Sequence, residues 1–133
     1  MGGETDLQQL LSSLSAVLDP QTYVFVTMRG PAPEGLAPKM VFEEVEGTTL
    51  ICTLQQARAH GLDWEYQSKM ITLNIHSSLE AVGFMAVIAT ALAAQGLSVN
   101  PVSGFYHDHI FVPVDRAGDA MRILAEIAAK ASA

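Results

Sequence analysis

The chain has 133 residues, of which half are hydrophobic, and a formal net charge of −7 at pH 7. This size and apolar content supply the core of one domain or of two very small ones, which excludes an intrinsically disordered chain. The acidic excess and the lack of a Lys/Arg cluster argue against binding to nucleic acid.

The chain has a single cysteine, Cys52, which excludes an internal disulfide and a multi-cysteine metal site. Within its apolar run, Cys52 is expected to be a small buried hydrophobe. The N-terminus lacks the positive and apolar regions of a signal peptide, and the apolar run over residues 81–94 is too short to span a bilayer. We therefore expect a cytoplasmic protein with no membrane partner.

The first half of the chain carries patterns for helix, strand, loop and hairpin. Near the N-terminus, apolar residues recur at helical spacing, with Thr5 or Asp6 as the cap and Asp19-Pro20 as the end. Three prolines and two glycines exclude regular structure from residues 29–38, which form either a surface connection or a lid over a pocket. The expected elements are a helix over 7–18, a strand over 23–28, a hairpin of 41–45 and 48–54 with a turn at Glu46-Gly47, and a helix over 55–60.

The second half alternates strand and helix signals and carries no charged residue from Ala81 through His107. A helix without charged residues must be buried on most sides. The expected elements are a half-buried strand around Trp64 and Tyr66, a strand over 70–76, a helix start at 77–80 with its body over 82–94, strands 97–99 and 110–112 joined by a turn near 101–108, and a helix over 116–130 capped by Asp115.

Four stretches of this sequence resemble the ACT domain, a small ligand-sensing fold. They are the strand-to-helix turn over 77–86, the helix end over 91–99, the hairpin over 103–112 and the hairpin over 46–52. The hairpin over 103–112 is similar to that of the aspartokinase-like subgroup of ACT domains. The resemblance covers about residues 20–131. It implies an α+β, ferredoxin-like fold of two βαββαβ-type repeats with antiparallel sheets. The first repeat, with a leading helix, is expected to cover residues 1–65, and the second to cover residues 66–133. The first repeat is expected to be degenerate, because the proline-rich loop replaces its crossover helix.

The turn before the charge-free helix is the candidate ligand site. A helix N-terminus presents unpaired N–H groups and a partial positive charge, which suit a carboxylate. Gly83 permits close approach of a ligand or of the sheet, and the Ser77-x-x-Glu80 pattern is also a capping box that needs no ligand. An ammonium group would find acceptors in Asp108, Glu43, Glu44, Glu80 or backbone carbonyls. The expected ligand-binding residues are Asn74, His76, Ser77, Ser78, Glu80, Val82, Gly83, Phe84, Phe105, Tyr106, His107 and Asp108.

Metal binding and catalysis have little support in the sequence. On a strand, His107 and His109 would point to one face and Asp108 to the other. A structural metal site needs about four ligands, and no further Cys/His cluster is near, so a role in the turn or at a ligand is favoured. Phosphate-loop, G-x-S-x-G and H-E-x-x-H patterns are absent from the sequence. We expect no catalytic residues, no metal and no cofactor.

The resemblance implies a non-catalytic regulatory protein that binds a small ligand, above all an amino acid, at an interface between ACT-like units. The apolar helix and exposed sheet edges favour a homo-oligomer, such as a dimer. The alternative is a pure oligomerisation or interaction module with no small-molecule ligand.

Overall fold

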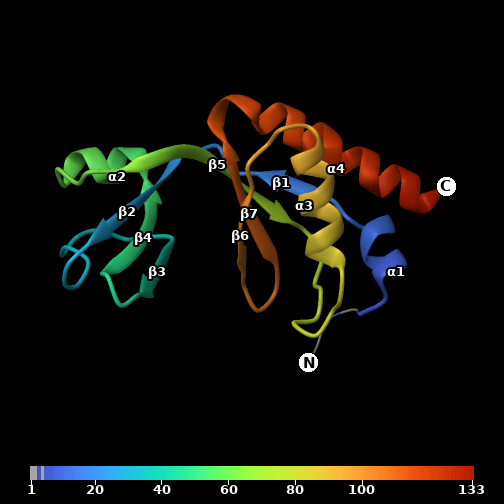
Figure 1. The fold of residues 1–133 in the computed structure, drawn as a ribbon, viewed down its shortest axis with the longest axis horizontal. Coiled ribbons are helices and arrows are strands. Elements are labelled where there is room, and N and C mark those ends of the chain that lie inside the picture. Colours follow the sequence, from blue (N-terminus) through green and yellow to red (C-terminus); the bar gives the residue numbers. More distant parts are fainter. Residues whose placement is uncertain (1–2, 4) are drawn as a thin grey trace. The chain divides into compact units, whose positions relative to one another are not determined.

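The computed structural model describes residues 3 and 5–133, which form two compact units (Figure 1). Unit 1 contains the N-terminal segment up to Asp19 together with Lys69–Ala133, and unit 2 contains Pro20–Ser68. Strand β5 (Glu65–Leu73) passes from one unit into the other. The expected halves 1–65 and 66–133 differ from these units, because the N-terminal segment packs with the C-terminal part of the chain.

Unit 1 has a ferredoxin-like arrangement in which the N-terminal segment supplies one strand. β1 pairs antiparallel with β5, β6 pairs antiparallel with β7, and the strand order is β1-β5-β7-β6. The order β5-α3-β6-β7-α4 is a βαββα unit, and β1 adds the sixth element from the other end of the chain. Its elements are α1 (Leu7–Ser12), β1 (Ala16–Leu18), the last part of β5, α3 (Phe84–Ala94), β6 (Asn100–Ser103), β7 (Asp108–Pro113), the 3₁₀ turn η1 (Val114–Arg116) and α4 (Ala117–Ser132).

The helices of unit 1 pack on one face of its sheet. Alternate residues of a strand share a face, which places Ile71 and Leu73 of β5 on the helix side. In Figure 1, α4 runs past α3 to end beside α1, where the Ser132 hydroxyl donates to the Ser12 carbonyl at 3.3 Å. The fully buried residues of this core include Leu10, Ile71, Leu73, Ile88, Leu92, Ile110, Val112 and Ala120.

Unit 2 is the degenerate repeat, in which the proline-rich loop occupies the place of a helix. Its strands are ordered β3-β4-β2-β5, and each neighbouring pair is antiparallel. From the loop, Ala32 and Leu36 pack against a core that includes Val24, Leu50 and Cys52. The expected replacement of the crossover helix is therefore confirmed. The elements of unit 2 are β2 (Tyr23–Met28), β3 (Met40–Glu43), β4 (Thr48–Thr53), α2 (Leu54–Ala59) and the first part of β5.

The N-terminal helix is shorter than the sequence pattern predicts. Asp6 is its cap, since the carboxylate accepts from the Gln9 N–H at 2.9 Å, but α1 ends at Ser12. Residues 16–18 then form β1, because pairing with β5 stabilises an extended backbone that the helical spacing of the leucines does not reveal. The predicted end at Asp19-Pro20 is wrong.

Other boundaries of unit 1 also move. The expected strands at 64–66 and 70–76 form one strand, β5, which ends at Leu73. Residues 97–99 precede β6, and Pro101, expected in a turn, lies inside this edge strand, where proline removes no ladder hydrogen bond. Asp115 lies in η1, and α4 begins at Ala117 without a side-chain cap. Within the described residues no helix is long and apolar enough to cross a membrane.

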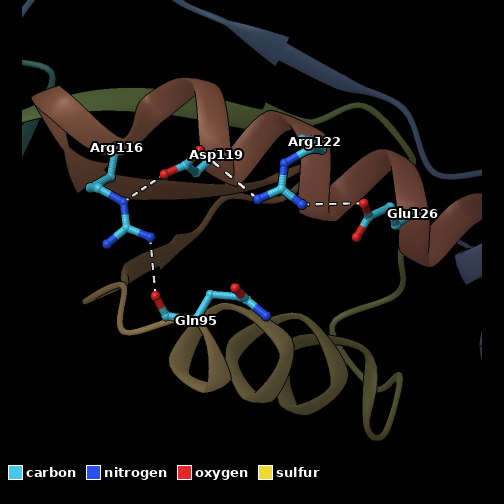
Figure 2. Close-up of polar contacts among 5 residues, drawn as sticks. All are labelled: Gln95, Arg116, Asp119, Arg122 and Glu126. Carbon is cyan, nitrogen blue, oxygen red and sulfur yellow. Dashed lines mark hydrogen bonds and ion pairs between the residues drawn. The ribbon is translucent and has the colours of Figure 1, made fainter.

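A charged network joins the start of α4 to the end of α3 (Figure 2). Arg116 donates from Nε to the Asp119 carboxylate at 2.7 Å and from Nη2 to the Gln95 carbonyl at 3.0 Å. Because Gln95 is the C-cap of α3, the guanidinium satisfies a terminal carbonyl and complements the negative end of the helix dipole. Further along α4, Arg122 pairs with Glu126 at 3.2 Å on the exposed surface.

We predict that Arg116→Ala lowers the free energy of unfolding by about 1 kcal/mol, through loss of the helix-end contact. The matched control, Arg122→Ala, removes a solvent-exposed pair and is expected to cost less than about 0.5 kcal/mol. Urea denaturation of both variants measures the difference. Equal losses would contradict the role assigned to the Gln95 contact.

Cys52 provides a pH-dependent prediction. The residue is 1 % exposed in the core of unit 2, and burial raises the pKa of its thiol above the ordinary value of 9.0. At a pH well below the ordinary pKa, the thiol is protonated in both the folded and the unfolded protein. As the pH rises, the thiol of the unfolded protein ionises first, which favours the unfolded state, and the folded state therefore loses stability. Wild type should therefore lose more stability than Cys52→Ala between about pH 8 and pH 10, measured by denaturation. A difference between the two proteins that is independent of pH would contradict this.

Candidate functional site

The segment between β5 and α3 is a loop and not a helix start. α3 begins at Phe84, so the predicted capping box of Ser77 and Glu80 is wrong. Instead, the Ser78 hydroxyl accepts from the Glu80 N–H at 3.1 Å and closes a local turn. The N-cap of α3 is Gly83, with φ of 91° and no side-chain hydrogen bond to the first turn of the helix. A left-handed glycine thus sets the helix start, which the sequence pattern placed several residues too early.

Two glycines bring the N-terminal segment close to this loop. A Cβ atom on Gly83 would lie 3.4 Å from Cδ2 of Leu7 in α1, an ordinary contact distance, so the left-handed backbone and not a lack of space favours glycine there. Gly3 lies so near the backbone of His76 that a side chain on Gly3 would collide with it. This contact could not be predicted, because no local sequence pattern indicates that the N-terminal segment packs against unit 1.

Aromatic rings from the loop and from the β6-β7 hairpin form a cluster at the surface of unit 1. The imidazole of His76 is 5.5 Å from the ring of Tyr106 and 6.2 Å from that of Phe105, centroid to centroid. The Phe105 and Tyr106 rings are in edge-to-face contact at 5.0 Å. Both are more than half exposed, at 57 % and 64 %. We call His76, Phe105 and Tyr106 the aromatic cluster.

A hydrogen bond joins the loop to β7 beside this cluster. The buried Ser77 hydroxyl donates to the Asp108 carboxylate at 3.3 Å. The hairpin turn is closed by the Gly104 N–H, which donates to the His107 carbonyl at 2.9 Å. The structure thus brings together five of the expected ligand-binding residues, from segments about 30 positions apart in sequence.

The remaining expected residues have other positions in unit 1. Phe84 is 3 % exposed in the core, and Val82 is 83 % exposed. Through its backbone N–H, Asn74 donates to the Ser15 carbonyl at 2.7 Å, which extends the contact between β5 and β1. The ring of His107 is 6.4 Å from that of His109. Among the described residues, no group of three or more His, Cys, Asp or Glu side chains is placed to hold a metal ion.

Two family models identify the chain. Both describe the ACT domain, and they match residues 2–69 and 65–126. The chain therefore belongs to the ACT-domain family. The two matched segments meet within β5, the strand that both units share.

Solved structures give the same fold. The chain is 42 % identical to a protein of unknown function from Vibrio cholerae, titled a possible transport protein, with a TM-score of 0.84 over 92 % of this chain and 95 % of that one. A protein from Agrobacterium tumefaciens shares 12 % identity, with a TM-score of 0.74 over 86 % and 89 %. The regulatory subunit of aspartate kinase from Thermus flavus shares 12 %, with a TM-score of 0.62 over 85 % and 96 %. The search of curated proteins gave no match.

We predict that Ser77→Ala loosens the loop after β5, because it removes the hydrogen bond to Asp108. Hydrogen exchange of the amides in residues 74–83 should become roughly ten- to a hundredfold faster, since a bond to a charged acceptor contributes on the order of 1.5–3 kcal/mol. The matched control is Ser78→Ala, which removes only the local bond to Glu80. Equal protection in wild type and Ser77→Ala would show that the Asp108 bond does not hold the loop.

Proposed function

We propose that this protein is a non-catalytic regulatory sensor that binds a small ligand, most specifically an amino acid, at the aromatic cluster of unit 1. Membership of the ACT-domain family supports a regulatory role. The observation that carries the proposal is the meeting of exposed rings and the Asp108 carboxylate with His76 and Ser77, which lie in the loop that leads into α3. The structural likeness to an aspartate kinase regulatory subunit shows the fold only.

The chemistry of this place suits an α-amino acid. The first turn of α3 has backbone N–H groups without a side-chain cap, and such groups favour a carboxylate. The Asp108 carboxylate is an acceptor for an ammonium group. The rings of Phe105 and Tyr106 offer apolar surface to a side chain. In this proposal a second ACT-like unit, brought by assembly, covers the ligand and passes the signal to a partner protein.

The test is a thermal-shift screen of the full chain against the twenty amino acids and related carboxylates. A ligand that binds only the folded state stabilises it by RT ln(1 + [L]/Kd), about 2.7 kcal/mol at one hundred times Kd. A selective, dose-dependent rise in Tm is expected. If no compound raises Tm while light scattering shows an oligomer, the alternative of a pure assembly module takes its place.

Variants localise the binding. With the best ligand of that screen, Asp108→Asn should reduce the affinity at least tenfold, because the ammonium group loses a charged partner. Asp115→Asn, which changes an exposed aspartate in η1, is the matched control and should bind like wild type. Isothermal titration calorimetry measures both. Unchanged affinity in Asp108→Asn would place the ligand away from the aromatic cluster.

A further inference from the structure

A pocket opens in unit 2 at the end of the sheet where β2 begins and β4 ends. Because these strands are antiparallel, with Tyr23 opposite Thr53, the residues before β2 and those after β4 lie next to each other. The Leu54 N–H donates to the Thr22 carbonyl at 2.9 Å and holds the two segments together. The pocket has a volume of about 340 Å³, and we call it the Arg58 pocket. It is lined by Gln21, Thr22, Thr53, Leu54, Gln55 and Arg58.

The charge of this pocket is positive. Of the described residues that line it, Arg58 is charged and none is acidic. The guanidinium of Arg58 has no ion pair and no hydrogen bond among the residues that the structure describes, whereas Arg116 and Arg122 both pair with carboxylates of α4. The chain has 14 acidic residues and 7 lysines and arginines, so most cations have a carboxylate to pair with. The donors of Arg58 therefore remain available to an anion from outside the chain.

Two neutral side chains beside Arg58 can donate to the same anion. Gln55 lies three residues before Arg58 on α2, so the two side chains share one face of the helix. Thr22 lines the pocket from the segment before β2. The Thr53 hydroxyl is already engaged with the N–H and the side chain of Gln56, which caps α2. The binding groups of the pocket are therefore side chains, and the capped start of this short helix contributes none.

These groups fit a carboxylate that carries one negative charge. A guanidinium presents parallel N–H donors to both oxygens of a carboxylate, and amide and hydroxyl donors can complete its hydrogen bonds. A phosphate monoester carries about −1.5 to −2 charges at pH 7, which is more than one arginine neutralises. The chain itself has a net charge of −7, which further disfavours the more highly charged anion.

The lining also argues against a zwitterion in this pocket. The ammonium group of an α-amino acid would meet no carboxylate among the described lining residues. Instead, Leu54 and the alkyl stem of Arg58 offer apolar surface to an aliphatic chain. Ligand pockets have volumes of roughly 300–1,000 Å³, and this one is near the lower limit. A short aliphatic carboxylate matches both the size and the lining.

We propose that the Arg58 pocket binds a small organic monocarboxylate that has no ammonium group, with its two oxygens on the guanidinium and its aliphatic part against Leu54. The site lies wholly within unit 2, and it stands whether or not the aromatic cluster of unit 1 binds an amino acid. It gives the protein a second ligand of a different chemical class.

An NMR titration of the ¹⁵N-labelled full chain with butyrate tests the site. Saturable shifts are expected for the amide signals of residues 21–22 and 53–58 at millimolar butyrate. Butyramide, which has the same shape without the charge, should leave these signals unchanged, and 2-aminobutyrate should bind there at least about fivefold more weakly. The proposal is overturned if butyrate shifts none of these signals, or if butyramide or 2-aminobutyrate binds as well. Tighter binding of methyl phosphate than of butyrate would also overturn it.

Arginine variants show whether Arg58 itself holds the carboxylate. Arg58→Gln should weaken butyrate binding about fivefold, because a solvent-exposed ion pair is lost. Arg58→Lys should recover part of that loss, since an ammonium group keeps the charge without the parallel donors. The matched control is Arg29→Gln, which removes an exposed arginine from the proline-rich loop of the same unit and should bind like wild type. Equal affinities of Arg58→Gln and Arg29→Gln would show that the site is not built on Arg58.

Discussion

The antiparallel pairing of β1 with β5 is the contact on which unit 1 depends. Ala16 lies opposite Leu73 and Leu18 opposite Ile71, so three residues from the start of the chain complete a sheet built from its second half. The same segment carries α1, whose Leu10 is fully buried against the helices of unit 1. It also brings Leu7 against Gly83 at the start of α3. The packing of the core and the geometry of the candidate site therefore both require this segment.

The parts of the fold that local chemistry determines could be predicted from the sequence. The strand Tyr23–Met28 has the expected bounds, and the β3-β4 hairpin forms as expected. Its turn lies one residue earlier than the expected Glu46-Gly47, because Glu44 and Gly47 pair through their backbones and leave Val45 and Glu46 at the tip. Proline and glycine content predicted the loop over 29–38, because these residues restrict the backbone without help from the rest of the chain. The expected ACT-like architecture with a degenerate first repeat is confirmed by the sheet order and the family matches.

The parts that long-range contacts determine could not be predicted. A helical period over residues 7–18 could not reveal that the last three of these residues pair with a strand more than fifty positions away. The pattern of Ser77 and Glu80 fits a capping box, yet Ser77 is bonded to Asp108. The meeting of His76 with Phe105 and Tyr106 depends on the closure of the hairpin. Even so, the resemblance to ACT domains indicates both the loop after β5 and the β6-β7 hairpin as candidate ligand-binding segments.

The two units differ in ways that fit the proposed function. Unit 1 has the crossover helix α3, the C-terminal helix α4 and a loop that joins exposed rings to a carboxylate, which suits recognition of a small polar molecule. Unit 2 has a proline-rich loop in place of one crossover helix, and its edge strand β3 exposes Val41 and Phe42. A sensor of this design requires a coupling between ligand binding and assembly, so that the ligand has different affinities for the assembly states.

The most direct test of the central claim is an NMR titration of ¹⁵N-labelled full-length protein with an equimolar mixture of the twenty amino acids at millimolar concentration. The account predicts saturable shifts of the amide signals from residues 74–83 and 104–108, with smaller changes elsewhere. Unchanged spectra, or shifts confined to unit 2, would contradict an amino-acid sensor built on the aromatic cluster of unit 1.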